Sequence, residues 1–176
     1  MRPQAPQQPN VYLKPGELAI ACQPLLVETV LGSCVSVSLY CPFKGIGALC
    51  HAMLPTGDAR DFKYVDSAIN HMVKSLSREG VNLSTVVAKL FGGADMFASN
   101  REMGSAKYPV GEQNITKARE VLAHYRITIS NHDVGGVYGR KLLFFSDTGQ
   151  VFIKKLSRKA VDMELMMSLV EGNECG

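Results

Sequence analysis

Residues 30–54 read VLGSCVSVSLYCPFKGIGALCHAML, and this stretch decides the fold that the sequence predicts. Two apolar runs, 34–40 and 46–53, are separated by Pro42 and Gly45, residues that favour a turn. Apolar and polar side chains alternate along the first run, as in a strand with one face in a core. The stretch therefore predicts an antiparallel hairpin with one apolar face and one more polar face.

The segments around this hairpin indicate further strands and three helices. Apolar residues recur with helical spacing over 64–79, over about 112–124 and over 159–170, where the apolar positions are Val161, Leu165, Met166 and Leu169. Runs rich in β-branched and apolar residues predict strands at 18–24, 25–31, 84–93 and 126–136, and a further hairpin over 140–156. We therefore expect an α/β fold: a layered α/β sandwich with mixed or antiparallel sheets flanked by about three helices.

Composition limits the kinds of protein that fit. Residues 1–12 carry a Pro- and Gln-rich segment without the apolar region of a secretory signal, and we expect a flexible leader there, one domain over 13–172 and a short tail over 173–176. The five cysteines indicate free thiols in reducing cytosol, and no apolar run approaches the length that spans a bilayer. A net charge of +3 gives no support for nucleic acid binding, although the basic run 154–159 is a candidate docking patch for an acidic partner.

Cys34 and His51 are the candidate reactive pair. A hairpin turn centred between residues 42 and 43 would set them directly opposite, with Cβ atoms about 4.5–5.5 Å apart. A loop two residues longer would make the pair diagonal on one face, and a shift of one residue would separate the two side chains. A histidine beside a thiol can accept its proton and later protonate a leaving group.

Residues before Cys34 supply candidates for the rest of such a site. A turn at Gly32 and Ser33 could leave backbone N–H groups free to bind an oxyanion. Thr29 or Glu28 could orient the imidazole of His51.

Other interpretations of the same residues stay open at this point. A cysteine and a histidine on neighbouring strands are often ordinary core residues. A structural zinc site is a further alternative, but the cysteines at 22, 34, 41 and 50 lack the short C-x-x-C spacing typical of one. The glycine pairs in FGGADMF and DVGGVYG do not match a nucleotide-binding pattern, and they predict tight turns with positive φ.

Taken together, LGSCVSVSLYCPFKGIGALCHAMLP, KYVDSAI, KLFGGADMF, VGEQN and DVGGVYGRKLLFFSDTGQVFIKKL resemble the chemoreceptor glutamine deamidase family, CheD, over about residues 17–156. The resemblance implies an α/β sandwich similar to the catalytic domain of cytotoxic necrotizing factor. It also implies that Cys34 attacks receptor glutamines, that His51 transfers protons and that Thr29 is the third catalytic member, with Glu28 as the competing choice. No metal or organic cofactor is implied.

The resemblance further implies a cytoplasmic protein-glutamine deamidase of bacterial chemotaxis. Its substrates would be cytoplasmic helices of methyl-accepting chemoreceptors, and a CheC-type phosphatase would be a possible partner. Two alternatives remain at this stage: a regulatory binding module with little or no catalysis, and a receptor methyl-ester hydrolase that uses the same thiol.

Overall fold

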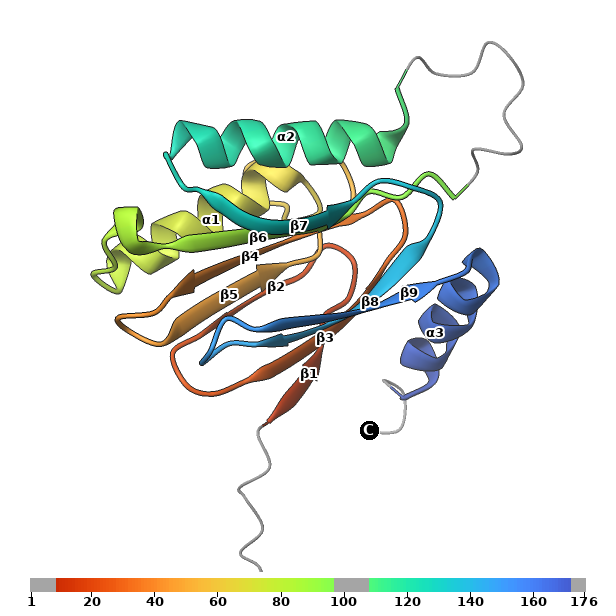
Figure 1. Cartoon of the computed structure of the whole chain (residues 1–176), viewed down its shortest axis with the longest axis horizontal. Coiled ribbons are helices and arrows are strands. Elements are labelled where there is room, and N and C mark those ends of the chain that lie inside the picture. The colour runs from red at the N-terminus through yellow and green to blue at the C-terminus, as the bar shows by residue number, and fades with distance from the viewer. Residues whose placement is uncertain (1–8, 97–107, 172–176) are drawn as a thin grey trace, which may run out of the picture.

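The computed structural model describes residues 9–96 and 108–171, and the chain forms four layers in the order helix, sheet, sheet, helix (Figure 1). Helices α1 (Val65–Arg78) and α2 (Val110–His124) cover one sheet, and α3 (Arg158–Glu171) lies on the far side of the other. The α/β sandwich expected from the sequence is confirmed. None of the helices in the described ranges is long and apolar enough to cross a membrane.

The larger sheet, within the described residues, has five strands in the order β2-β5-β4-β6-β7. Neighbouring strands run antiparallel except β6 and β7, which run parallel. The strands are β2 (Leu18–Ala21), β5 (Ile46–Cys50), β4 (Val35–Cys41), β6 (Val87–Gly92) and β7 (Ile129–Val134). A short 3-10 helix, η1 (Leu83–Thr85), leads into β6.

The smaller sheet has four strands in the order β1-β3-β8-β9 over the same described ranges. The strands are β1 (Asn10–Tyr12), β3 (Leu26–Leu31), β8 (Gly139–Phe145) and β9 (Val151–Leu156). Because β1 pairs in parallel with β3, residues 10–12 belong to the sheet. They are therefore not part of the flexible leader expected over residues 1–12. Residues 1–8 of that leader and the tail 173–176 lie outside the described residues.

Apolar interiors separate the layers, and two of them lie on the two faces of the larger sheet. Alternate residues of β4, such as Val37 and Leu39, face α1 and α2, where Ile69 and Met72 are also fully buried. The opposite face of β4 and β5 packs against the smaller sheet, with Leu49 in that second interior. Successive residues of a strand point to opposite faces of the sheet. Alternate side chains of residues 34–40 therefore lie in two different interiors.

The predicted hairpin is present, but its register differs from the direct pairing expected. Cys41 pairs with Ile46, and the intervening turn ends at Gly45, which has φ of +62°. Residue numbers across the pair therefore sum to 87, so His51 lies across from Ser36, and Cys34 is its diagonal neighbour. The direct opposition is wrong because the turn is two residues longer, and the diagonal alternative keeps both side chains on one face.

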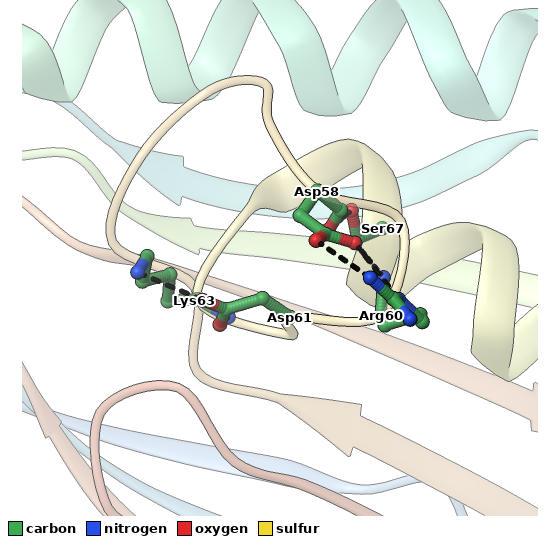
Figure 2. Close-up of polar contacts among 5 residues, drawn as sticks. All are labelled: Asp58, Arg60, Asp61, Lys63 and Ser67. Carbon is green, nitrogen blue, oxygen red and sulfur yellow. Dashed lines mark hydrogen bonds and ion pairs between the residues drawn. The ribbon is translucent and has the colours of Figure 1, made fainter.

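The loop between β5 and α1 is held by short-range polar contacts (Figure 2). Asp58 pairs with Arg60 at 3.5 Å, Asp61 pairs with Lys63 at 2.7 Å, and the Ser67 hydroxyl donates to the Asp58 carbonyl. These contacts shape the loop that follows His51, which comes directly after β5.

The C-terminal helix departs from its predicted apolar stripe. Val161 is buried and Leu165 packs against it, but Met166 is 69% exposed. The side chain of Leu169 lies outside the described part of the structure. Helix α3 covers one side of the smaller sheet, so only a narrow stripe of its surface is in contact.

Candidate active site

The imidazole of His51 is held by Thr29 in the interior between the two sheets. The Thr29 hydroxyl lies 2.7 Å from Nδ1 of His51 and donates to the carbonyl of Leu13, also at 2.7 Å. Because the Leu13 carbonyl can only accept, we assign the hydroxyl proton to that bond, which leaves the Thr29 oxygen to accept from a protonated Nδ1. His51 Nε2 is then the unprotonated nitrogen, and this buried atom has no hydrogen-bond partner among the described residues.

Thr29 and Glu28, the two candidates for orienting His51, point in opposite directions from β3. Thr29 is fully buried and faces the larger sheet. The carboxylate of Glu28 pairs with Lys141 at 2.7 Å, and Lys141 also binds Glu164 of α3. Strand alternation therefore directs Glu28 toward α3, away from the imidazole.

Cys34 directly precedes β4 and lies on the same face of the sheet as His51. Its partly exposed side chain contacts a buried apolar cluster of Leu31, Phe91 and Leu142. Thr29 lies in β3, Cys34 directly precedes β4, and His51 directly follows β5. The three side chains therefore come from both sheets and converge on the interior between them.

Both reactive groups are neutral near pH 7 in the unliganded protein. Burial raises the pKa of the Cys34 thiol to about 11. Burial lowers the pKa of His51 to about 4, and the nearby Leu13 carbonyl opposes that change only in part. The site therefore holds a neutral thiol and a neutral imidazole, and a neutral imidazole can accept a proton from a thiol.

The turn before Cys34 is fixed by its carbonyl groups. The amide of Ala94 donates to Gly32 at 2.9 Å, and the amide of Gly93 donates to Cys34 at 2.7 Å. Ser33 accepts a bond from a buried side chain, Asn114 of α2. With these carbonyls held from one side, the Cys34 amide makes no bond to any other described residue and is available to an oxyanion.

Gly32 lies in this turn next to the side chain of Met96. Its φ is not positive, so the turn does not need the conformational freedom of glycine. A side chain at this position would instead meet the end of Met96. A pocket of about 240 Å³ opens here, bordered by Ser33, Met96 and Val110.

Residues 9–96 and 108–171 contain no cluster of side chains suited to the zinc site considered as an alternative. No three His, Cys, Asp or Glu side chains there could share a metal ion. Cys22 is exposed on one surface, while Cys41 and Cys50 lie in the interior under the helices. Cys34 faces the other interior.

Comparison with known proteins gives a consistent family. Residues 53–155 match the family model described as CheD chemotactic sensory transduction. A Geobacter sulfurreducens protein named probable chemoreceptor glutamine deamidase CheD 2 is 44% identical over 158 residues, which cover 89% of this chain and 96% of that protein. The chain belongs to the CheD family. The family predicted from the sequence motifs is confirmed.

Other CheD relatives match to a similar extent. A Maridesulfovibrio salexigens protein is 38% identical, over 85% of this chain and 93% of its own length. A Methanosarcina barkeri protein is 40% identical, over 81% of this chain and 95% of its own length. Both are named probable chemoreceptor glutamine deamidase CheD. The match to the CheD family model begins at residue 53, so it does not include Thr29, Cys34 or His51.

Proposed function

We propose that this protein is a protein-glutamine deamidase that converts glutamines of methyl-accepting chemoreceptors to glutamate. The observation that carries the proposal is the 2.7 Å contact between Thr29 and Nδ1 of His51, on the same sheet face as Cys34. The names of the relatives supply the reaction and the substrate class. The proposal sets the reaction in the cytoplasm, where thiols stay reduced.

The first half of the reaction forms a thioester. Nε2 of His51 accepts the thiol proton as Sγ of Cys34 bonds to the carboxamide carbon, and the carbonyl π electrons move to its oxygen. The Cys34 amide, beside the turn at Gly32 and Ser33, stabilises that oxyanion. As the oxyanion collapses, the C–N bond breaks, and the proton on Nε2 passes to the leaving nitrogen, which departs as ammonia.

The second half of the reaction restores the thiol. His51 removes a proton from water, the resulting hydroxide attacks the thioester, and the C–S bond breaks to leave a carboxylic acid. The proton then returns to Cys34, and the acid ionises. The receptor gains one negative charge for each glutamine converted, and no step needs a metal or an organic cofactor.

Thr29 acts through His51 in this scheme. With Nδ1–H bound to the threonine oxygen, the ring presents Nε2 as the base, and the imidazolium formed on attack keeps a hydrogen-bond acceptor. The neutral ground state fits a base that accepts the proton during attack, because a thiol with a pKa of about 11 forms little thiolate beforehand.

A direct test is incubation with a cytoplasmic chemoreceptor fragment, followed by mass-spectrometric mapping of Gln-to-Glu conversion. We expect conversion with the wild type and a loss of at least 1,000-fold, roughly 4 kcal/mol, with Cys34→Ala. Undiminished conversion by Cys34→Ala would refute the mechanism. Faster cleavage of methyl esters than of amides on the same fragment would favour the ester hydrolase, and binding without conversion would favour the regulatory module.

Family membership also makes a CheC-type phosphatase a proposed partner. Titration calorimetry with a phosphatase of that class from the same genome tests this. Heat that disappears when receptor fragment is present in excess would indicate that both partners use one surface.

A further inference from the structure

Asn114 of α2 joins the two chain segments that carry Cys34 and His51. Its side chain is fully buried, and its Nδ2 donates to the carbonyl of Ser33 at 3.2 Å and to the carbonyl of Met53 at 2.9 Å. Ser33 immediately precedes Cys34, and Met53 lies two residues beyond His51. One amide group therefore links the turn before the nucleophile to the chain that follows the base.

The bond to Ser33 also determines where the Cys34 amide points. No cis peptide bond occurs in the described residues, and the C=O and N–H of a trans peptide point in opposite directions. Fixing the Ser33 carbonyl therefore fixes the Cys34 N–H on the other side of that peptide plane. The neighbouring carbonyls of Gly32 and Cys34 are held by backbone amides, which a substitution does not remove. The Ser33 carbonyl is held by the side chain of Asn114, so substitution of Asn114 removes that hydrogen bond.

The remaining polar atom of Asn114 argues against a purely stabilising role. Its Oδ1 is buried and has no hydrogen-bond partner among the described residues. An unsatisfied buried acceptor destabilises a fold by about 1–3 kcal/mol. A buried amide with one satisfied end is the kind of group that a functional constraint explains.

We infer that Asn114 is a positioning residue for the oxyanion: through Ser33 and Met53, it holds the Cys34 amide aimed at the tetrahedral intermediate. The inference rests on the proposed acyl transfer at Cys34. It assigns a role to the last residue of VGEQN, a motif that supported the family resemblance without a chemical function.

Two thiol reagents test this role without a receptor substrate. Acylation of Cys34 by p-nitrophenyl acetate passes through an oxyanion, whereas alkylation by iodoacetamide is a direct displacement that forms none. Peptide mapping by mass spectrometry separates Cys34 from the exposed Cys22. In Asn114→Ala we expect acylation to slow at least tenfold and alkylation to change less than threefold. A loss of local structure would instead change both rates together.

Leu122→Ala is the matched control. Leu122 is fully buried in the same helix two turns away, so its truncation destabilises α2 without touching the turn. We expect its acylation-to-alkylation ratio to match the wild type. Asn114→Ser, which keeps one donor, should give an intermediate ratio and serves if the alanine variant does not fold.

Parallel changes in both rates, an unchanged ratio in the foldable Asn114 variant, or an equal loss in Leu122→Ala would overturn the inference. Neither reagent requires a receptor, so the ratio can be measured whether or not the protein acts on receptors. Failure of the receptor assay would therefore refute the proposed substrate, while the reagent ratio would still decide the role of Asn114.

Discussion

The proposed chemistry depends on the hydroxyl of Thr29, which holds the ring of His51. Thr29→Val keeps the shape but removes the acceptor for Nδ1–H of His51, so the ring loses its fixed tautomer. We expect kcat for receptor deamidation to fall about 10- to 100-fold, roughly 1.4–2.7 kcal/mol, with little change in KM.

Two matched variants separate this role from general damage. Thr29→Ser keeps the hydroxyl and should retain most activity. Glu28→Gln alters the neighbouring residue, which binds Lys141 on the other side of β3, and should leave kcat within twofold. If Glu28→Gln lost more activity than Thr29→Val, the orientation role given to Thr29 would be wrong.

His51 should make stability depend on pH in acid. Its folded pKa of about 4 lies below its ordinary value of 6.5, so between these values the unfolded chain binds a proton that the folded protein does not. The free energy of unfolding should fall by up to about 3 kcal/mol as pH drops from 6.5 to 4, with no further loss from this residue at lower pH. Urea denaturation across this range measures it, and His51→Gln should remove that part of the slope. An identical slope in the variant would contradict the assignment.

At the scale of elements, Gly92 links the end of β6 to the start of β4. Its φ is +100°, and a Cβ there would collide with the Cys34 carbonyl oxygen. Gly135 has φ of +70°, and a Cβ there would have no neighbouring atom within 4 Å. Gly135→Ala is therefore the control that measures the cost of positive φ without a collision. Gly92→Ala should destabilise by at least about 3 kcal/mol and Gly135→Ala by about 1–2 kcal/mol, as measured by urea denaturation. Equal losses would show that the collision is relieved by a small backbone shift.

The elements themselves were largely predictable because their signals are local. The apolar spacing that predicted a helix over 64–79 corresponds to Val65–Arg78, which buries Ile69 and Met72 against the larger sheet. The glycine pairs at 92–93 and 135–136 all have positive φ, as predicted. The hairpin register was not predictable, because residues 42–45 are compatible with turns of different length, and sheet pairing chooses among them.

At the scale of the whole molecule, an ion pair ties the two sheets together. Arg140 of β8, whose side chain is 3% exposed, binds Asp133 of β7 at 2.6 Å. Asp133→Asn leaves the buried guanidinium without its counter-charge, and we expect a loss of about 3 kcal/mol in the free energy of unfolding. Asp61→Asn breaks an exposed, solvent-screened pair and should lower the free energy of unfolding much less than Asp133→Asn does. Thermal or urea denaturation measures both variants. Similar losses in Asp133→Asn and Asp61→Asn would show that the Arg140–Asp133 pair stabilises the fold no more than an exposed ion pair does.

The sequence by itself determined the α/β class, the main helices and strands, and the family, because periodicity, turn residues and motifs are properties of short segments. It also singled out Cys34 and His51, since chemistry depends on residue type. Only the tertiary structure separated Thr29 from Glu28, because their directions depend on which side of β3 each sheet and helix occupies. The contacts of Asn114 likewise exist only after α2 packs over the ends of β4 and β5, which brings residues 33, 53 and 114 together from distant parts of the chain.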